Sequence, residues 1–104
     1  MAISTSNVAA APATIIVSSG DTAITFMSLC NHGATTVLCD IHIIPNGDLS
    51  SINNLLITDL EIIAGDTFIL YQGGEKILLG NGDYVQVVSD TPNVVSVVTS
   101  FVVV

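Results

Sequence analysis

Short runs of apolar and β-branched residues, each closed by a turn signal, constrain this chain more than any other feature. The runs are rich in Val, Ile and Thr, and no window shows the sustained periodicity of an amphipathic helix. Gly, Asn, Asp and Pro separate them. The pattern predicts eight strands, over residues 13–18, 22–30, 36–44, 54–63, 67–71, 76–79, 84–89 and 94–103.

The regular spacing of these strands predicts an all-β fold, an antiparallel β-sandwich with jelly-roll-like connections. The chain of 104 residues has the length of one domain, and residues 13–104 are expected to form it. Residues 1–12 are rich in Ala and Ser, and they are expected to form an extended or flexible N-terminal arm. Such an arm is expected to lie across a neighbouring subunit.

Four Gly-Asp dipeptides mark the joints between strands. Glycine adopts positive φ without steric cost, and an aspartate side chain can accept hydrogen bonds from nearby backbone N–H groups. Calcium binding is the alternative, but it requires several oxygen ligands around one point, and no D-x-D-x-D run is present. The sequence therefore favours turns at Gly20-Asp21, Gly47-Asp48, Gly65-Asp66 and Gly82-Asp83.

Alternation along two strands predicts an assembly interface. In residues 36–44, Cys39 and Ile41 point to one face, and Asp40 and His42 to the other. The last strand is apolar on both faces, so it is either central in the fold or covered by another subunit. The residues expected at such an interface are Asp40, His42, Val94, Val98, Val102 and Val104.

Charge excludes some partners. The net charge is −8, and Lys76 is the only lysine or arginine. Nucleic acid binding requires several basic side chains to neutralise phosphates, and an anionic membrane surface attracts the same residues. Neither nucleic acid nor a membrane is therefore expected as a partner. No apolar run reaches the roughly 18 residues of a membrane-spanning helix.

The stretch "SLCNHGATTVLCDIH" holds both cysteines and both histidines. Its spacing differs from that of a zinc finger, and strand alternation separates Cys39 from His42, so no metal site is expected. A disulfide between Cys30 and Cys39 would require a two-residue Ala-Thr loop, which is a poor hairpin turn. The stretch is expected to form a hairpin with a turn near His32 and Gly33, and two free thiols are favoured over the disulfide.

No arrangement of catalytic residues is visible. The sequence has no G-x-S-x-G motif, and neither histidine has a recognisable set of catalytic partners. Asp59 and Glu61 share a strand face, but paired acids on an outer face commonly serve solubility alone. The prediction is therefore a protein that is not an enzyme and has no cofactor, although a small hydrolase or metalloprotein and a carbohydrate- or receptor-binding module remain alternatives.

Several segments together resemble the small β-sandwich virion structural proteins of tailed phages, especially cyanophages. They are "IIVSSGDTAITFMSLCNHGATTVLCDIHIIPNGD", "LEIIAGDTFIL", "KILLGNGDYVQVVSD" and "NVVSVVTSFVVV". The resemblance implies a non-enzymatic part of a virus particle, assembled in the host cytoplasm as a homo-oligomer, with a trimer favoured. A capsid decoration protein on the outside of the particle, contacting the major capsid protein, is expected first. A neck, head–tail, tail or baseplate component is the alternative.

Overall fold

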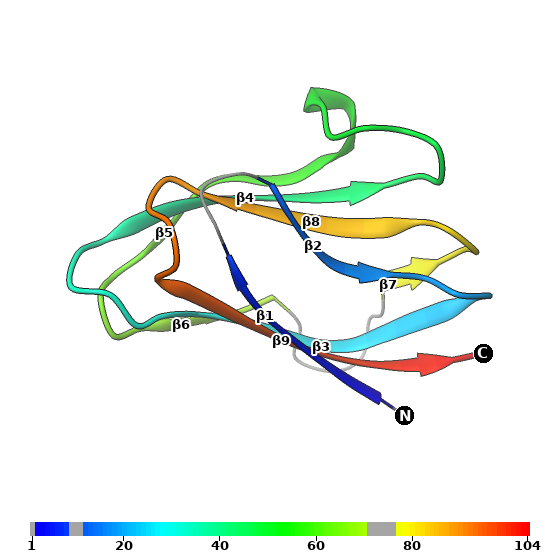
Figure 1. Ribbon diagram of the computed structural model, residues 1–104, viewed down its shortest axis with the longest axis horizontal. Coiled ribbons are helices and arrows are strands. Elements are labelled where there is room, and N and C mark those ends of the chain that lie inside the picture. The colour runs from blue at the N-terminus through cyan, green and yellow to red at the C-terminus, as the bar shows by residue number, and fades with distance from the viewer. Residues whose placement is uncertain (1, 9–11, 71–76) are drawn as a thin grey trace.

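Antiparallel strands in two layers make up the computed structural model, which describes residues 2–8, 12–70 and 77–104 (Figure 1). Strands β2 to β9 coincide with the eight predicted strands to within about two residues, so the all-β prediction is confirmed. The elements are β1 (Ala2–Val8), β2 (Ala13–Val17), β3 (Thr22–Asn31), β4 (Val37–Ile44), the 3-10 helix η1 (Ile52–Asn54), β5 (Leu55–Ile62), β6 (Thr67–Ile69), β7 (Ile77–Leu79), β8 (Tyr84–Ser89) and β9 (Val95–Val103).

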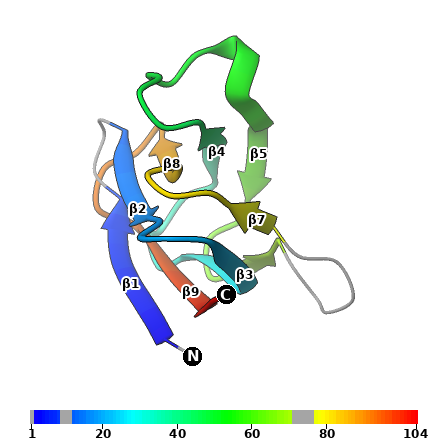
Figure 2. The ribbon, with the colours of Figure 1, turned by 90° about the vertical axis from the view of Figure 1, so that its right-hand side faces the viewer.

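The two sheets have the strand arrangement of a jelly roll. Sheet A has the order β1-β9-β3-β6, and β7 also pairs with β3, while sheet B has the order β2-β8-β4-β5. Because β6 and β7 pair with opposite ends of β3, they lie along the same edge of sheet A. The chain crosses between the sheets after β1, β2, β3, β5, β7 and β8, which wraps one sheet over the other (Figure 2).

The N-terminal segment differs from the predicted arm. Residues 2–8 are extended, but they pair antiparallel with β9 of the same chain over their whole length, from Ala2 opposite Phe101 to Val8 opposite Val95. Val8 is fully buried and belongs to the core. The segment is therefore a strand of the sandwich, so its expected place across a neighbouring subunit is wrong for residues 2–8.

The predicted hairpin between β3 and β4 is also wrong. The two strands belong to different sheets, so residues 32–36 form a crossover and not a hairpin turn. Asn31, at the end of β3, fixes this crossover. Its side-chain Nδ2 donates to the carbonyl oxygens of Thr35 at 2.8 Å and Ile62 at 2.9 Å, and its Oδ1 accepts from the backbone N–H of Gly33 at 2.9 Å. One buried amide thereby joins the ends of both sheets.

Three of the four Gly-Asp joints are turns, as predicted, and the joint at Gly20-Asp21 is a bend. All four glycines have positive φ, between 74° and 88°. At three joints the aspartate N–H donates to the carbonyl three residues earlier, which closes a β-turn. Asp83 also uses its carboxylate, which accepts from the N–H of Gly80 at 2.8 Å and of Asn46 at 2.9 Å. This aspartate therefore holds two neighbouring turns together.

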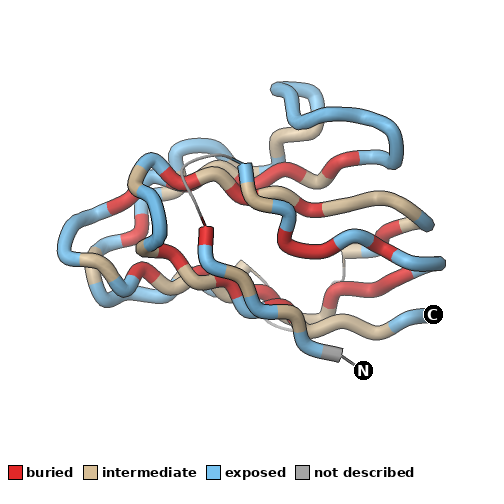
Figure 3. Tube along the Cα trace, viewed as in Figure 1, coloured by how far each residue is buried: buried red, intermediate tan, exposed pale blue. Residues whose placement is uncertain are grey.

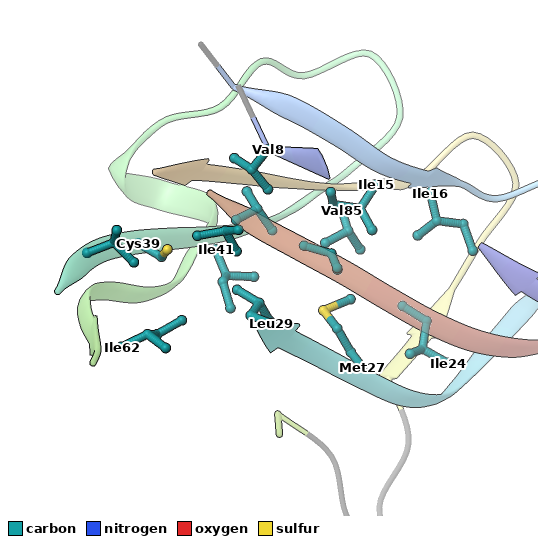
Figure 4. Close-up of a cluster of buried hydrophobic side chains, with 14 of the residues drawn as sticks. Val8, Ile15, Ile16, Ile24, Met27, Leu29, Cys39, Ile41, Ile62 and Val85 are labelled. Atoms are coloured by element: carbon teal, nitrogen blue, oxygen red, sulfur yellow. The ribbon is translucent and has the colours of Figure 1, made fainter. Parts of the chain in front are cut away.

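The core lies between the two sheets (Figure 3). Met27 and Leu29 of sheet A and Ile41 and Val85 of sheet B are fully buried within it, as Figure 4 shows. Burial of each such side chain contributes about 1.5–3 kcal/mol to folding. The predicted inward direction of Cys39 and Ile41 is confirmed, since both belong to this cluster.

Candidate assembly surface

Asp40 stabilises an irregularity in sheet B. The pairing of β4 with β5 shifts between Cys39 and Ile41, where two residues of β5 oppose Asp40 alone. Its Oδ1 accepts from the backbone N–H of Asp59 at 2.9 Å and from the hydroxyl of Thr58 at 3.1 Å. Asp59 has a φ of 51°, an unusual value for a residue other than glycine. The carboxylate of Asp40 therefore serves this β-bulge.

His42 is covered by its own chain. It lies on the outer face of sheet B but is only 8% exposed, and its Nδ1 lies 2.9 Å from Oδ1 of Asn54 in η1. The hydroxyl of Tyr84 in β8 donates to the carbonyl oxygen of Asp48. The segment 45–54 thus folds back onto the outer face of sheet B, at the top of Figure 1. His42 was expected to be open to contact by another subunit, but the segment 45–54 of its own chain covers it.

The two cysteines lie in different environments. Cys39 is fully buried in the core, whereas Cys30 is half-buried on the outer face of sheet A, and both are free thiols. Burial raises the pKa of the Cys39 thiol, the carboxylates of Asp90 and Asp40 raise it further, and a hydrogen bond with Ser89 opposes them. No group of three potential metal ligands occurs among the residues that the structure describes.

The outer face of sheet A, here called the neutral face, has an unusual composition. The strands of sheet A contain no charged residue within their described bounds, Ala2–Val8, Thr22–Asn31, Thr67–Ile69, Ile77–Leu79 and Val95–Val103. Its larger apolar side chains are those of Ile3, Phe26, Ile69, Leu78, Val98 and Val102. Between them lie the hydroxyl side chains of Thr5, Thr25, Ser28, Thr67, Ser96 and Ser100.

The charged residues in the described part of the chain lie elsewhere. Within strands they occur only in β4 and β5 of sheet B, as Asp40, Asp59 and Glu61. The others lie in the connections between strands, at Asp21, Asp48, Asp66, Asp83 and Asp90. The molecule therefore has a sheet with a neutral outer face and an opposite sheet that carries acidic side chains.

The structure places the four predicted interface valines in three environments. Val98 and Val102 lie on the neutral face, and Val98 is 36% exposed near the middle of β9. Val94 precedes β9 and packs against the core, so it does not belong to this face. Val104 follows β9 and is 74% exposed.

Sequence reasoning missed the extent of this face. The apolar last strand indicated it, but the contributions of β1, β3, β6 and β7 depend on which strands share a sheet. One signal was present in the sequence, namely the absence of charge from seven of the nine strand segments, but these include β2 and β8 of sheet B, so composition alone does not single out sheet A.

Comparisons with known proteins give no match to any family model, curated protein or solved structure. The described residues contain no helix that is both long and apolar enough to span a membrane.

Proposed function

We propose that this protein is a non-enzymatic structural protein of a phage virion, which assembles as a homo-oligomer on the outside of the particle as a capsid decoration protein. The observation that carries the proposal is the neutral face. A whole sheet without charge in its described strands, in a chain of net charge −8, is suited to contact between subunits. The jelly-roll arrangement agrees with it, since this architecture is common in viral capsid domains.

Two polar side chains of β4 that the sequence placed at an interface have contacts within their own chain. Asp40 holds the bulge in β5, and His42 is bonded to Asn54. These contacts support a role in architecture. The net charge of −8 supports a position outside the particle, because a protein with this charge is repelled by packaged DNA.

The proposed partners are further copies of this chain, with a trimer favoured, and the major capsid protein. A neck, head–tail, tail or baseplate component has the same need for a subunit contact surface, so the position in the particle requires a separate measurement. Copy number per particle distinguishes these positions. A decoration protein covers the capsid lattice and is present in many copies, whereas a neck, tail or baseplate component is present in a few copies around the tail axis.

Quantitative mass spectrometry of purified phage particles that carry this gene tests the proposal. Hundreds of copies per particle are expected for a capsid decoration protein. A few copies would instead indicate a neck, tail or baseplate component and overturn the decoration assignment. The absence of the protein from particles that are otherwise complete would overturn the virion assignment itself.

A further inference from the structure

We infer that the neutral face is the surface through which copies of this chain associate with one another, with Val98 near the centre of the contact. This inference rests on the homo-oligomeric part of the proposed function and does not depend on a position in a virion. The register places Val98 between Thr5 of β1 and Ser28 of β3, in the middle of sheet A.

The charge distribution favours a second copy as the occupant. Two copies that met through sheet B or through the connections would bring carboxylates of the same sign together. The chain has one lysine or arginine against nine acidic residues, so it cannot neutralise them. Like charges that face each other across an interface cost several kcal/mol. Two neutral faces avoid this cost, whereas a basic partner would be attracted to the acidic residues of sheet B.

The side chains of the neutral face suit a close contact. Valine, isoleucine, leucine and phenylalanine supply apolar area, and their neighbours are Asn7 and short hydroxyl side chains. The hydroxyl of Thr25 is already bonded to Ser100, at 3.1 Å from its carbonyl oxygen and 2.8 Å from its hydroxyl. This pair therefore brings its own hydrogen bonds into a contact, whereas the other hydroxyl groups of the face would be bonded by the second copy or by bridging water.

The size of the neutral face matches a modest interface. Four strands at a spacing of about 4.8 Å give a width of roughly 19 Å, and nine residues at about 3.3 Å give a length of roughly 30 Å. The flat projection is then roughly 570 Å² for each copy, and the accessible area of a pleated face is larger. Stable interfaces bury about 800 Å² for each partner. A contact of that size therefore requires nearly the whole of this face, with the relief of its side chains adding to the flat area.

A matched pair of variants tests the inference. Val98→Glu places a carboxylate on the neutral face, and Leu38→Glu places one on the outer face of sheet B, at a strand position with 40% exposure against 36% for Val98. Both variants add one negative charge, so general repulsion between copies changes equally. Sedimentation equilibrium over a range of protein concentrations measures association, and circular dichroism verifies that each variant is folded.

We expect Val98→Glu to weaken association by about 100-fold or more, because an unpaired carboxylate is costly to bury. Leu38→Glu should associate as the wild type does. The inference would be overturned if both variants associated as strongly as the wild type does. It would also be overturned if both substitutions weakened association equally. A wild-type protein that stays monomeric at every concentration would also overturn it.

Cys30 gives a second measurement that requires no substitution. It lies on β3 between Ser96 of β9 and Thr67 of β6, on the neutral face. Alkylation by iodoacetamide should slow at least several-fold when the wild type is concentrated enough to associate, whereas the buried Cys39 should stay protected throughout. An unchanged Cys30 rate in the oligomer would overturn the inference. Association through this face in a protein that is absent from phage particles would uphold the inference and reject the virion role.

Discussion

Replacement of Thr99 by valine isolates the energetic effect of one buried hydroxyl. Thr99 lies in the middle of β9, opposite Ser4 of β1 and Met27 of β3, and it has no measurable exposure. Its Oγ1 has no hydrogen-bond partner among the residues that the structure describes. The hydroxyl of Ser4 donates to the carbonyl oxygen of Ile15 across the sandwich. Folding therefore removes the Thr99 hydroxyl from water without replacing its hydrogen bond.

The size of the effect follows from this environment. A buried polar group without a partner costs about 1–3 kcal/mol, and valine has nearly the same shape as threonine without that cost. We expect Thr99→Val to raise the free energy of unfolding by about 1–2 kcal/mol. In a domain of this size, each kcal/mol corresponds to roughly 4–8 °C in Tm.

Thr22→Val is the matched control. Thr22 is 2% exposed, and a 2.8 Å hydrogen bond joins its hydroxyl to that of Ser18. Its replacement should lower the free energy of unfolding by about 1 kcal/mol. Urea and thermal unfolding, followed by circular dichroism at one protein concentration, measure both changes. A Thr99→Val variant that is less stable than the wild type would refute the assignment of an unsatisfied hydroxyl.

Three further predictions concern buried polar and backbone features. Asn31→Ala should lower the free energy of unfolding by about 2–4 kcal/mol in urea titrations, because three side-chain hydrogen bonds are lost and buried groups are left unpaired; a loss below about 1 kcal/mol would contradict the joining role of this residue. The pKa of Cys39 is raised in the folded state. The contribution of this protonated thiol to the free energy of unfolding is therefore complete below the ordinary thiol pKa near 9, and it is lost as the pH rises from there through the pKa of the folded state. The free energy of unfolding, measured against pH, should therefore fall at alkaline pH in the wild type and in Cys30→Ala. The part of this fall that comes from the thiol should be absent in Cys39→Ala, and identical pH profiles in all three proteins would contradict the prediction. Gly47→Ala should lower the free energy of unfolding by about 1 kcal/mol, because of the positive φ alone. Gly82→Ala should lower it further, because its added methyl carbon would also lie 2.5 Å from the side chain of Asn46 in a neighbouring turn. Thermal unfolding ranks the two variants, and the reverse order would count against the packing between these turns.

Local patterns predicted most of the strands because each strand has its own alternation and its own turn. The positive φ of Gly20, Gly47, Gly65 and Gly82 is a local property of the same kind. β1 was missed because two of its inward positions, Ser4 and Ser6, are polar, so the segment AISTSNV shows little apolar alternation before Val8.

Long-range features could not be predicted in this way. The crossover after β3 depends on the contact of Asn31 with Ile62, which is 31 residues away in the sequence. Likewise, His42 was correctly assigned to the outer face of its strand, but its cover by η1 depends on how residues 45–54 fold back. The neutral face was only partly foreseen for the same reason, since strand composition is local and strand order is not.

The pairing of β1 with β9 has a consequence for synthesis of the protein. These strands join residues near the two ends of the chain, such as Ala2 and Phe101. β9 is also the strand that links β1 to β3, so sheet A cannot form in its final order until β9 has left the ribosome. Loop closure over such a distance is slow, and sandwiches commonly fold in milliseconds to seconds. During translation β1 and one edge of β3 must therefore wait unpaired for β9, open to other chains or to chaperones.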